Sequence, residues 1–284
     1  MPEVEALRRW LEPRLTGTSF ERVEIASLSA LKTVALAPTA LLGLEILSVE
    51  RRGKFLAIGQ DGAWLVFHLA RAGWLRWYET VPAAPARPGK SPIALRVAVD
   101  GGAGFDLTEA GTQKRLAVYI VAALTDVPGI SDLGPDPLGE GFGRPELDAI
   151  LDAAGRSQLK GVLRDQKVLA GIGNAYSDEI LHAARMSPFK PSNSLDDAER
   201  DMLLTAMQTE LRDAIARADG LKPSELKDGK RGAMAVHGRT GLPCPVCGST
   251  VAEVSFADSS LQYCPGCQTG GKPLADRRLS KLLK

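Results

Sequence analysis

The sequence predicts an α+β protein of several domains, and three observations lead to that prediction. Short β-like runs separated by Asp-Gly and Gly-Gly turns fill the chain up to about residue 125. Helical patterns then dominate from Pro145 to about Ala218. All four cysteines follow within one short segment near the C-terminus. We therefore expect an N-terminal antiparallel β-sandwich with flanking helices, a helical domain and a C-terminal β-hairpin.

Composition and charge narrow the class of protein. The chain has 284 residues, 44% of them hydrophobic and 24% charged, which is ordinary for a globular protein of two domains. Its opening residues lack the apolar core of a signal peptide, so we expect a cytoplasmic, nucleoid-associated protein. The net charge is only +1, but residues 222–284 hold ten Lys or Arg against five Asp or Glu. Such a basic segment fits either phosphate binding or a solvated tail.

The patterns also predict where the elements and domain boundaries lie. We expect a helix over residues 5–15 and a loop over 81–92. Strands are predicted over residues 44–50, 54–59, 64–69, 74–78, 93–99 and 104–107. The predicted domains are a β-rich domain over 1–127, a linker over 128–144, a helical domain over 145–236 and a hairpin with a basic tail over 237–284.

The segment Leu159–Pro188 reads as two helices joined by a glycine-punctuated turn. Apolar residues recur at helical spacing on both sides of the turn, and Pro188 ends the second helix. Gly171 and Gly173 permit positive φ and a close approach of another backbone. Amides at the start of the second helix can bind an anion, with Asn174 as an adjacent donor. The same pattern also fits a packed helical hairpin with no ligand.

The cysteines form two Cys-x-x-Cys pairs, Cys244/Cys247 and Cys264/Cys267, separated by sixteen residues. This spacing is typical of four thiolates that hold one structural Zn²⁺ tetrahedrally. Disulfides are the alternative, but a cytosolic chain would keep them reduced. Between the pairs, strands are predicted over residues 251–256 and 261–263, around an Asp258–Ser260 turn.

Several of these motifs together resemble the formamidopyrimidine-DNA glycosylase / endonuclease VIII family of base-excision repair enzymes. In its helix–two-turn–helix the family pattern is matched by Lys160, Asp165, Gln166, Gly171, Gly173, Asn174, Tyr176 and Glu179. Further agreement comes from residues 51–56, from His68-Leu69 with Gly73 and Leu75-Arg76, from the Leu-Gly-Pro-Asp-Pro-Leu string at 133–138 and from His-Gly-Arg-Thr-Gly at 237–241. The resemblance implies DNA contacts by Lys160, Gly171, Gly173, Asn174, Arg71 and Arg239. Arg71, Gln113 or Lys114 would fill the void left by a flipped nucleotide.

The resemblance also implies a reaction at the amino terminus. A lyase of this kind needs an amine that forms a Schiff base with the sugar C1′. Pro2 would supply a secondary amine after removal of Met1, Glu3 would transfer protons, and Lys54 would hold a phosphate or polarise the sugar. The alternative is a proline and an acid that merely begin a helix, where both are favoured.

The chain departs from the family pattern in three places. One is the set of void-filling side chains, where Arg71 stands in place of the family's methionine. The opening of the chain is about three residues shorter, which corresponds to about 4.5 Å of helix. Residues 248–263 between the cysteine pairs contain no Lys or Arg, and Ser259 or Ser260 stands where the family has an arginine. We expect a monomeric DNA repair glycosylase with AP lyase activity, which excises damaged bases and acts on double-stranded DNA that contains damaged bases or abasic sites. The alternatives are a weakly active or inactive damaged-DNA-binding protein, and a zinc-ribbon interaction module without a role on DNA.

Overall fold

The computed structural model describes residues 1–284 apart from 34, 88–91, 111–112, 257–258 and 276–284. The described chain divides into two compact units. We call residues 2–133 with 218–227 the N-terminal unit, and residue 1 with 134–217 and 228–284 the C-terminal unit.

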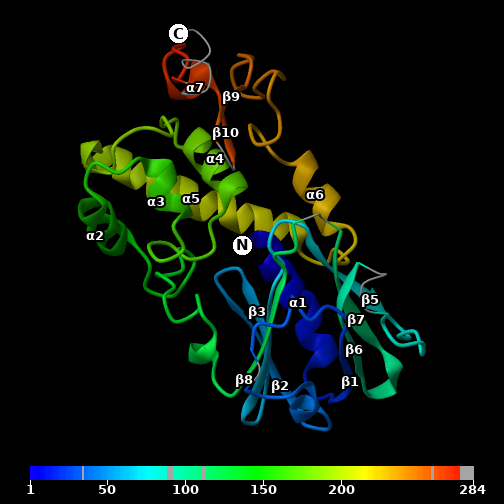
Figure 1. Ribbon diagram of the computed structural model, residues 1–284. Helices are drawn as coiled ribbons and strands as arrows, with labels where there is room; N and C mark the ends of the chain where they lie inside the picture. The colour runs from blue at the N-terminus through cyan, green and yellow to red at the C-terminus, as the bar shows by residue number, and fades with distance from the viewer. Residues whose placement is uncertain (34, 88–91, 111–112, 257–258, 276–284) are drawn as a thin grey trace. The chain divides into compact units, whose positions relative to one another are not determined.

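Two four-stranded antiparallel sheets build the N-terminal unit (Figure 1). The first sheet has the order β1-β6-β7-β5, with bounds Phe20–Ile25, Ile93–Val99, Gly104–Glu109 and Gly73–Tyr78. The second has the order β2-β3-β4-β8, with bounds Ile46–Arg52, Phe55–Gln60, Ala63–His68 and Ala117–Val121. Short 3-10 turns lie at Pro38–Leu41 (η1), Asp100–Gly102 (η2) and Leu124–Asp126 (η3). The predicted antiparallel β-sandwich is confirmed, and β1 and β8 are strands that the sequence patterns did not predict.

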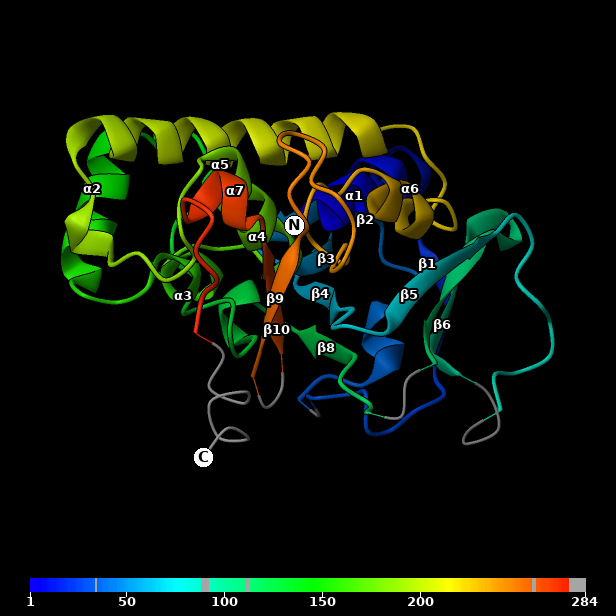
Figure 2. The same ribbon diagram turned by 90° about the horizontal axis from the view of Figure 1, so that it is seen from above.

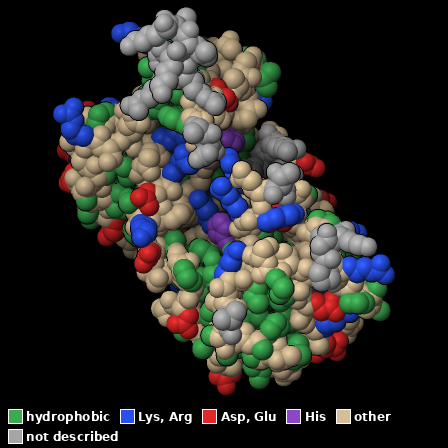
Figure 3. Space-filling view, viewed as in Figure 1, with side chains coloured by type: hydrophobic (Ala, Val, Ile, Leu, Met, Phe, Trp, Pro, Cys, Tyr) green, Lys and Arg blue, Asp and Glu red, His purple; other side chains and the backbone are tan. Residues whose placement is uncertain are grey.

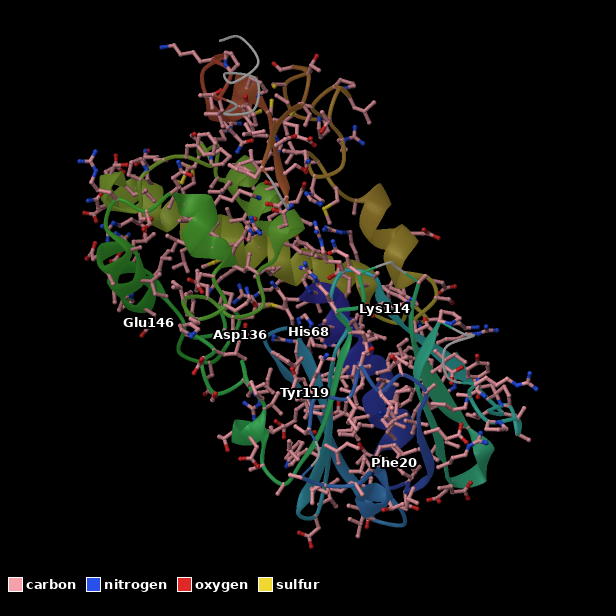
Figure 4. All side chains as sticks on the ribbon, viewed as in Figure 1. Phe20, His68, Lys114, Tyr119, Asp136 and Glu146 are labelled. Carbon is pink, nitrogen blue, oxygen red and sulfur yellow. The ribbon has the colours of Figure 1, made fainter. Side chains whose placement is uncertain are left out.

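Helix α1 (Pro2–Leu15) packs against this sandwich and alongside β2. Pro2 occupies its first turn together with Glu3 and Glu5, where a proline and negative charges are both favoured. Leu7, Leu11 and Leu15 follow at four-residue spacing, so they share one face and enter the core that also contains Phe20 (Figure 4). The helix therefore begins at Pro2, earlier than the predicted start at residue 5.

The C-terminal unit contains the helices and the second β-hairpin, β9 (Ala252–Ser255) paired with β10 (Ser260–Tyr263). Its helices are α2 (Arg144–Ala154), α3 (Leu159–Arg164), α4 (Asn174–Ala183), α5 (Asp197–Ala218), α6 (Leu226–Gly232) and α7 (Pro265–Gln268), with a 3-10 turn η4 at Ser192–Ser194. The last residue of α5 and the first two residues of α6 belong to the N-terminal unit. Figure 2 shows α5 as the long helix beside α3 and α4. A shared hydrophobic core joins these three helices and α2. Among the described residues, no helix combines the length and apolar character needed to cross a membrane.

Charge is mixed on the surface of the N-terminal unit. On the face shown in Figure 3, basic, acidic and exposed hydrophobic side chains of that unit are interspersed. This agrees with the net charge of +1. Any binding of a polyanion therefore depends on particular side chains and amides rather than on a uniformly basic surface.

Candidate functional site

The start of α1 is fixed to the β2–β3 turn by an ion pair. Glu5 of α1 accepts a hydrogen bond of 2.9 Å from Nε of Arg51 in β2, and both side chains are about nine-tenths buried. Arg51 also donates to the carbonyl of Gly53, which adopts a φ of +57° in the turn before Lys54. The same guanidinium therefore holds both the first turn of α1, which begins at Pro2, and the turn that carries Lys54.

A partly buried histidine, His68, lies at the end of β4, next to this turn. His68 pairs with Phe55 across the β3–β4 ladder, and Figure 4 shows it in the same sheet as Tyr119, whose ring also packs against Phe55. Burial and the charge of Lys54 lower the pKa of His68 to about 4. The imidazole is therefore neutral at physiological pH, and its Nδ1 accepts a hydrogen bond of 3.1 Å from the amide of Ala70.

That hydrogen bond shapes the turn that carries Arg71. Ala70 has a φ of +52°, a conformation that costs about 1 kcal/mol or more for a residue with a Cβ. The contact with His68 offsets part of this cost. Arg71 follows directly and is exposed, whereas Lys114, an alternative void-filling residue, donates to the carbonyl of Glu109 (Figure 4).

We expect His68 to remain neutral down to about pH 4. As the pH falls through about 6.5, the unfolded chain takes up this proton while the folded protein does not, so His68 should lower stability between about pH 6.5 and pH 4. An NMR titration of the imidazole tests this expectation. A midpoint near 6.5 would contradict it, and His68→Asn should remove this part of the pH dependence of unfolding.

In the C-terminal unit, α3 and α4 form the predicted helix–two-turn–helix. Gly171 has a φ of +89°, as the glycine-rich turn predicted. The Gln166 side chain closes the turn, because it accepts from the amide of Gly171 at 2.9 Å and donates to the carbonyl of Ile172 at 2.8 Å. The Gly171 amide thus has a partner within the protein.

Lys160 of α3 faces inward. Its side chain is about 94% buried, and its ammonium donates to the carbonyl of Asn174, to Oγ of Ser177 and to Oδ1 of Asp178. An ammonium has three donors, and these three contacts use them all. A phosphate contact by Lys160 stays a prediction, and the structure adds a role in holding α3 to α4.

Asn174, the first residue of α4, links that helix to the zinc hairpin. Its Nδ2 donates to the carbonyl of Ser260 in β10 at 2.8 Å. Its Oδ1 is buried and has no hydrogen-bond partner among the described residues. Ser260 belongs to the predicted hairpin turn, of which Asp258 lies outside the described residues.

Two acidic residues of α4 bind the segment that leads to the cysteines, and the sequence patterns did not predict this. The carboxylate of Glu179 accepts from the amides of three successive residues, Ala235, Val236 and His237, at 2.7–3.0 Å. Asp178 is fully buried and lies 2.8 Å from Nδ1 of His237. The sequence offered two signals for these contacts, namely the acidic pair after Tyr176 and the isolated His237. Nothing in the sequence connects residues so far apart.

Arg239 follows this anchored segment. Its Nη2 donates to the carbonyl of Pro243 at 3.4 Å, while its Nε is buried without a hydrogen-bond partner among the described residues. The predicted contact of Arg239 with DNA is not tested by this geometry.

The four cysteine sulfurs converge as the double Cys-x-x-Cys spacing predicted. The Sγ atoms of Cys244 and Cys267 lie 3.9 Å apart, and those of Cys247 and Cys264 lie 3.3 Å apart. Zn–S bonds of about 2.3 Å in a tetrahedron place sulfurs about 3.8 Å apart, so this donor set fits one zinc ion. Nε2 of His182 lies close to these sulfurs. It and the Sγ atoms of Cys244, Cys264 and Cys267 all lie within 4.8 Å of one another. No open position for a substrate water remains, so the zinc is structural.

Three family models cover most of the chain. The formamidopyrimidine-DNA glycosylase N-terminal domain matches residues 1–114, its H2TH domain matches 133–224, and the zinc finger found in FPG and IleRS matches 241–270. The formamidopyrimidine-DNA glycosylase of Thermus thermophilus is 34% identical over 95% of this chain and 98% of its own length. The chain belongs to the formamidopyrimidine-DNA glycosylase family.

Other comparisons agree with this membership. An uncharacterized formamidopyrimidine-DNA glycosylase-like protein of Mycobacterium tuberculosis is 56% identical over 54% of this chain and 94% of its own length. The crystal structure of the Thermus thermophilus MutM (Fpg) protein matches with a TM-score of 0.79 at 31% identity, covering 96% of this chain and 99% of that one. The Lactococcus lactis Fpg bound to FAPY-dG-containing DNA matches with a TM-score of 0.80 at 26% identity, covering 94% and 99%. The β-sandwich, helix–two-turn–helix and zinc hairpin found here are thus the Fpg fold.

Proposed function

We propose that this member of the family is a DNA glycosylase with AP lyase activity that uses Pro2 as its nucleophile. After removal of Met1, the Pro2 nitrogen attacks C1′ of the damaged nucleotide, and the bond from C1′ to the base breaks. The base leaves with the bonding electron pair and takes up a proton, and Glu3 transfers protons at the sugar. The observation that carries this proposal is the anchoring of the Pro2 helix and the Lys54 turn by one buried Glu5–Arg51 pair.

The proposed partner is double-stranded DNA with damaged bases or abasic sites. The Lactococcus lactis Fpg has been crystallised with FAPY-dG-containing DNA and with DNA that contains an abasic site. In this chain Asn174, the Gly171–Gly173 turn and Arg239 are proposed to bind phosphates. Lys160 is proposed to join them by exchanging one of its three internal acceptors for a phosphate oxygen. Arg71, exposed on its strained turn, is proposed to fill the space of the flipped nucleotide.

A panel of oligonucleotide duplexes tests the proposed activity. Each duplex carries one oxidised or ring-opened base, or an abasic site, and strand cleavage and borohydride trapping are measured together. We expect cleavage and a trapped adduct on at least one lesion and none on undamaged DNA. Absence of both products on every duplex would contradict the proposal.

A second candidate is a protein that binds damaged DNA without cutting it. Two observations favour it: the charge of Lys160 is paired with Asp178, and residues 248–263 supply no cation. Both features weaken phosphate contacts that an active enzyme would use. Selective binding of an abasic duplex, with no cleavage or trapping in the same panel, would establish this candidate.

We expect Asn174→Ala to weaken binding by about tenfold on all DNA sequences, because one hydrogen bond to a charged phosphate is worth roughly 1.5 kcal/mol and carries no sequence information. Fluorescence anisotropy titrations on several duplexes measure this. Asn193→Ala is the matched control, since Asn193 is exposed on η4 of the same unit. A loss confined to one sequence would contradict the assignment.

A further inference from the structure

His182 lies in the last turn of α4 and faces the cysteine cluster. The residue is only 6% exposed, and its Nε2 is 3.3 Å from Sγ of Cys244. Cys244 is itself buried and belongs to the small core of the zinc module with Val236, Val251 and Cys264. A histidine from the helix–two-turn–helix therefore reaches into the metal site of the adjoining module.

We propose that His182 is a positioning residue of the zinc site, which donates its Nε2–H to the thiolate of Cys244 from outside the coordination shell. A metal-bound Cys244 carries no proton and can only accept in this contact. The four cysteines already provide the tetrahedral set, so the imidazole has no vacant position to fill. The N–H···S bond orients the sulfur and stabilises its negative charge.

The same contact would connect metal retention to the DNA-binding helix. Asn174 at the start of α4 holds the carbonyl of Ser260, and His182 at its end holds Cys244. Between them, Glu179 binds the amides of residues 235–237. Helix α4 thus contacts the zinc module at each of its turns, and His182 is the contact that touches a metal ligand.

Two variants of the zinc-loaded full-length protein test this proposal. His182→Phe keeps an aromatic ring and removes the donor, whereas His182→Gln keeps an N–H donor. Outer-sphere partners of metal ligands typically contribute about 10–100-fold to metal affinity. We therefore expect His182→Phe to lose zinc to a competing chelator about 10–100-fold more readily, and His182→Gln to recover much of that loss.

His237→Phe is the matched control. His237 also packs against α4, but it contacts Asp178 and no cysteine. Zinc retention by this control should stay close to that of the unaltered protein. Equal zinc retention in His182→Phe and the unaltered protein would overturn the proposal. An equal loss of zinc in His182→Phe and His237→Phe would also overturn it. A general weakening of the contacts between α4 and residues 235–267 would then explain both losses.

Cobalt substitution separates a positioning residue from a ligand. The visible absorption of bound Co²⁺ reports the donor atoms, and we expect the same four-thiolate spectrum in the unaltered protein, His182→Phe and His182→Gln. A spectrum of three thiolates and one imidazole in the unaltered protein, lost in His182→Phe, would overturn the proposal in favour of direct ligation. Because this readout requires only metal binding, it is independent of DNA binding and of lyase activity.

Discussion

Protein that carries a retained tag before Pro2 is expected to lose borohydride trapping on abasic DNA. The tag converts the proposed nucleophile into an amide, which cannot form a Schiff base. Pro2→Gly should also reduce trapping sharply, because it replaces the secondary amine and removes the ring that begins α1. A misplaced nucleophile costs roughly 100-fold in rate, so the loss should be at least of that size.

The matched control for the tag is the same protein after proteolytic removal of the tag to leave Pro2 at the terminus. Its trapping should return, and binding to abasic DNA should be similar in both forms. Equal trapping by tagged and untagged protein would assign the reaction to a lysine. Lys54→Gln would then be the next variant, since Lys54 lies on the turn that Arg51 holds beside α1.

Removal of zinc under reducing conditions should unfold the β9–β10 hairpin and weaken DNA binding together. Each strand has only four residues, and an isolated two-stranded hairpin is marginal in water. The small core beside this hairpin consists of Val236, Val251 and two of the cysteines, Cys244 and Cys264. The metal that the cysteines bind therefore provides stability that a larger hydrophobic core would otherwise provide. Structural zinc contributes about 10–16 kcal/mol in small zinc modules, which is far more than this hairpin can replace.

Zinc content, DNA affinity and hydrogen exchange, measured in parallel during chelation, test this prediction. Amides of residues 235–237 should lose protection with the hairpin, because Glu179 holds them only while the segment is ordered. Amides of β6 and β7 in the N-terminal unit should keep their protection. Zinc loss that leaves DNA affinity unchanged would contradict the coupling.

The sequence predicted the features that depend on local patterns. Strand β6 was predicted with its observed bounds, and the zinc site followed from the cysteine spacing. Periodicity predicted two helices joined by a glycine-rich turn, and the family resemblance identified them as a helix–two-turn–helix. Strand β1 was missed because its charged residues interrupt the alternation, and β8 because all five of its residues are buried. Residues 226–232 are also helical, beyond the helical stretch that was predicted to end at about Ala218.

The polar contacts of α4 could not be predicted in the same way. Asp178 and Glu179 read as part of a helix face, but their partners lie more than fifty residues further along the chain. His182 fits a helical pattern, and nothing in that pattern predicts its contact with Cys244. Similarly, Lys160 matches the family motif, although only the structure shows that its ammonium is buried against Asp178. Burial and long-range partners come from tertiary packing, which periodicity does not encode.

The site of covalent attachment tests the proposed function most directly. Untagged protein is reduced with borohydride on an abasic duplex, digested, and the adduct is located by mass spectrometry. The account predicts a nucleotide remnant on the nitrogen of Pro2, in the peptide that begins α1. An adduct on Lys54, or on any residue other than Pro2, would contradict it.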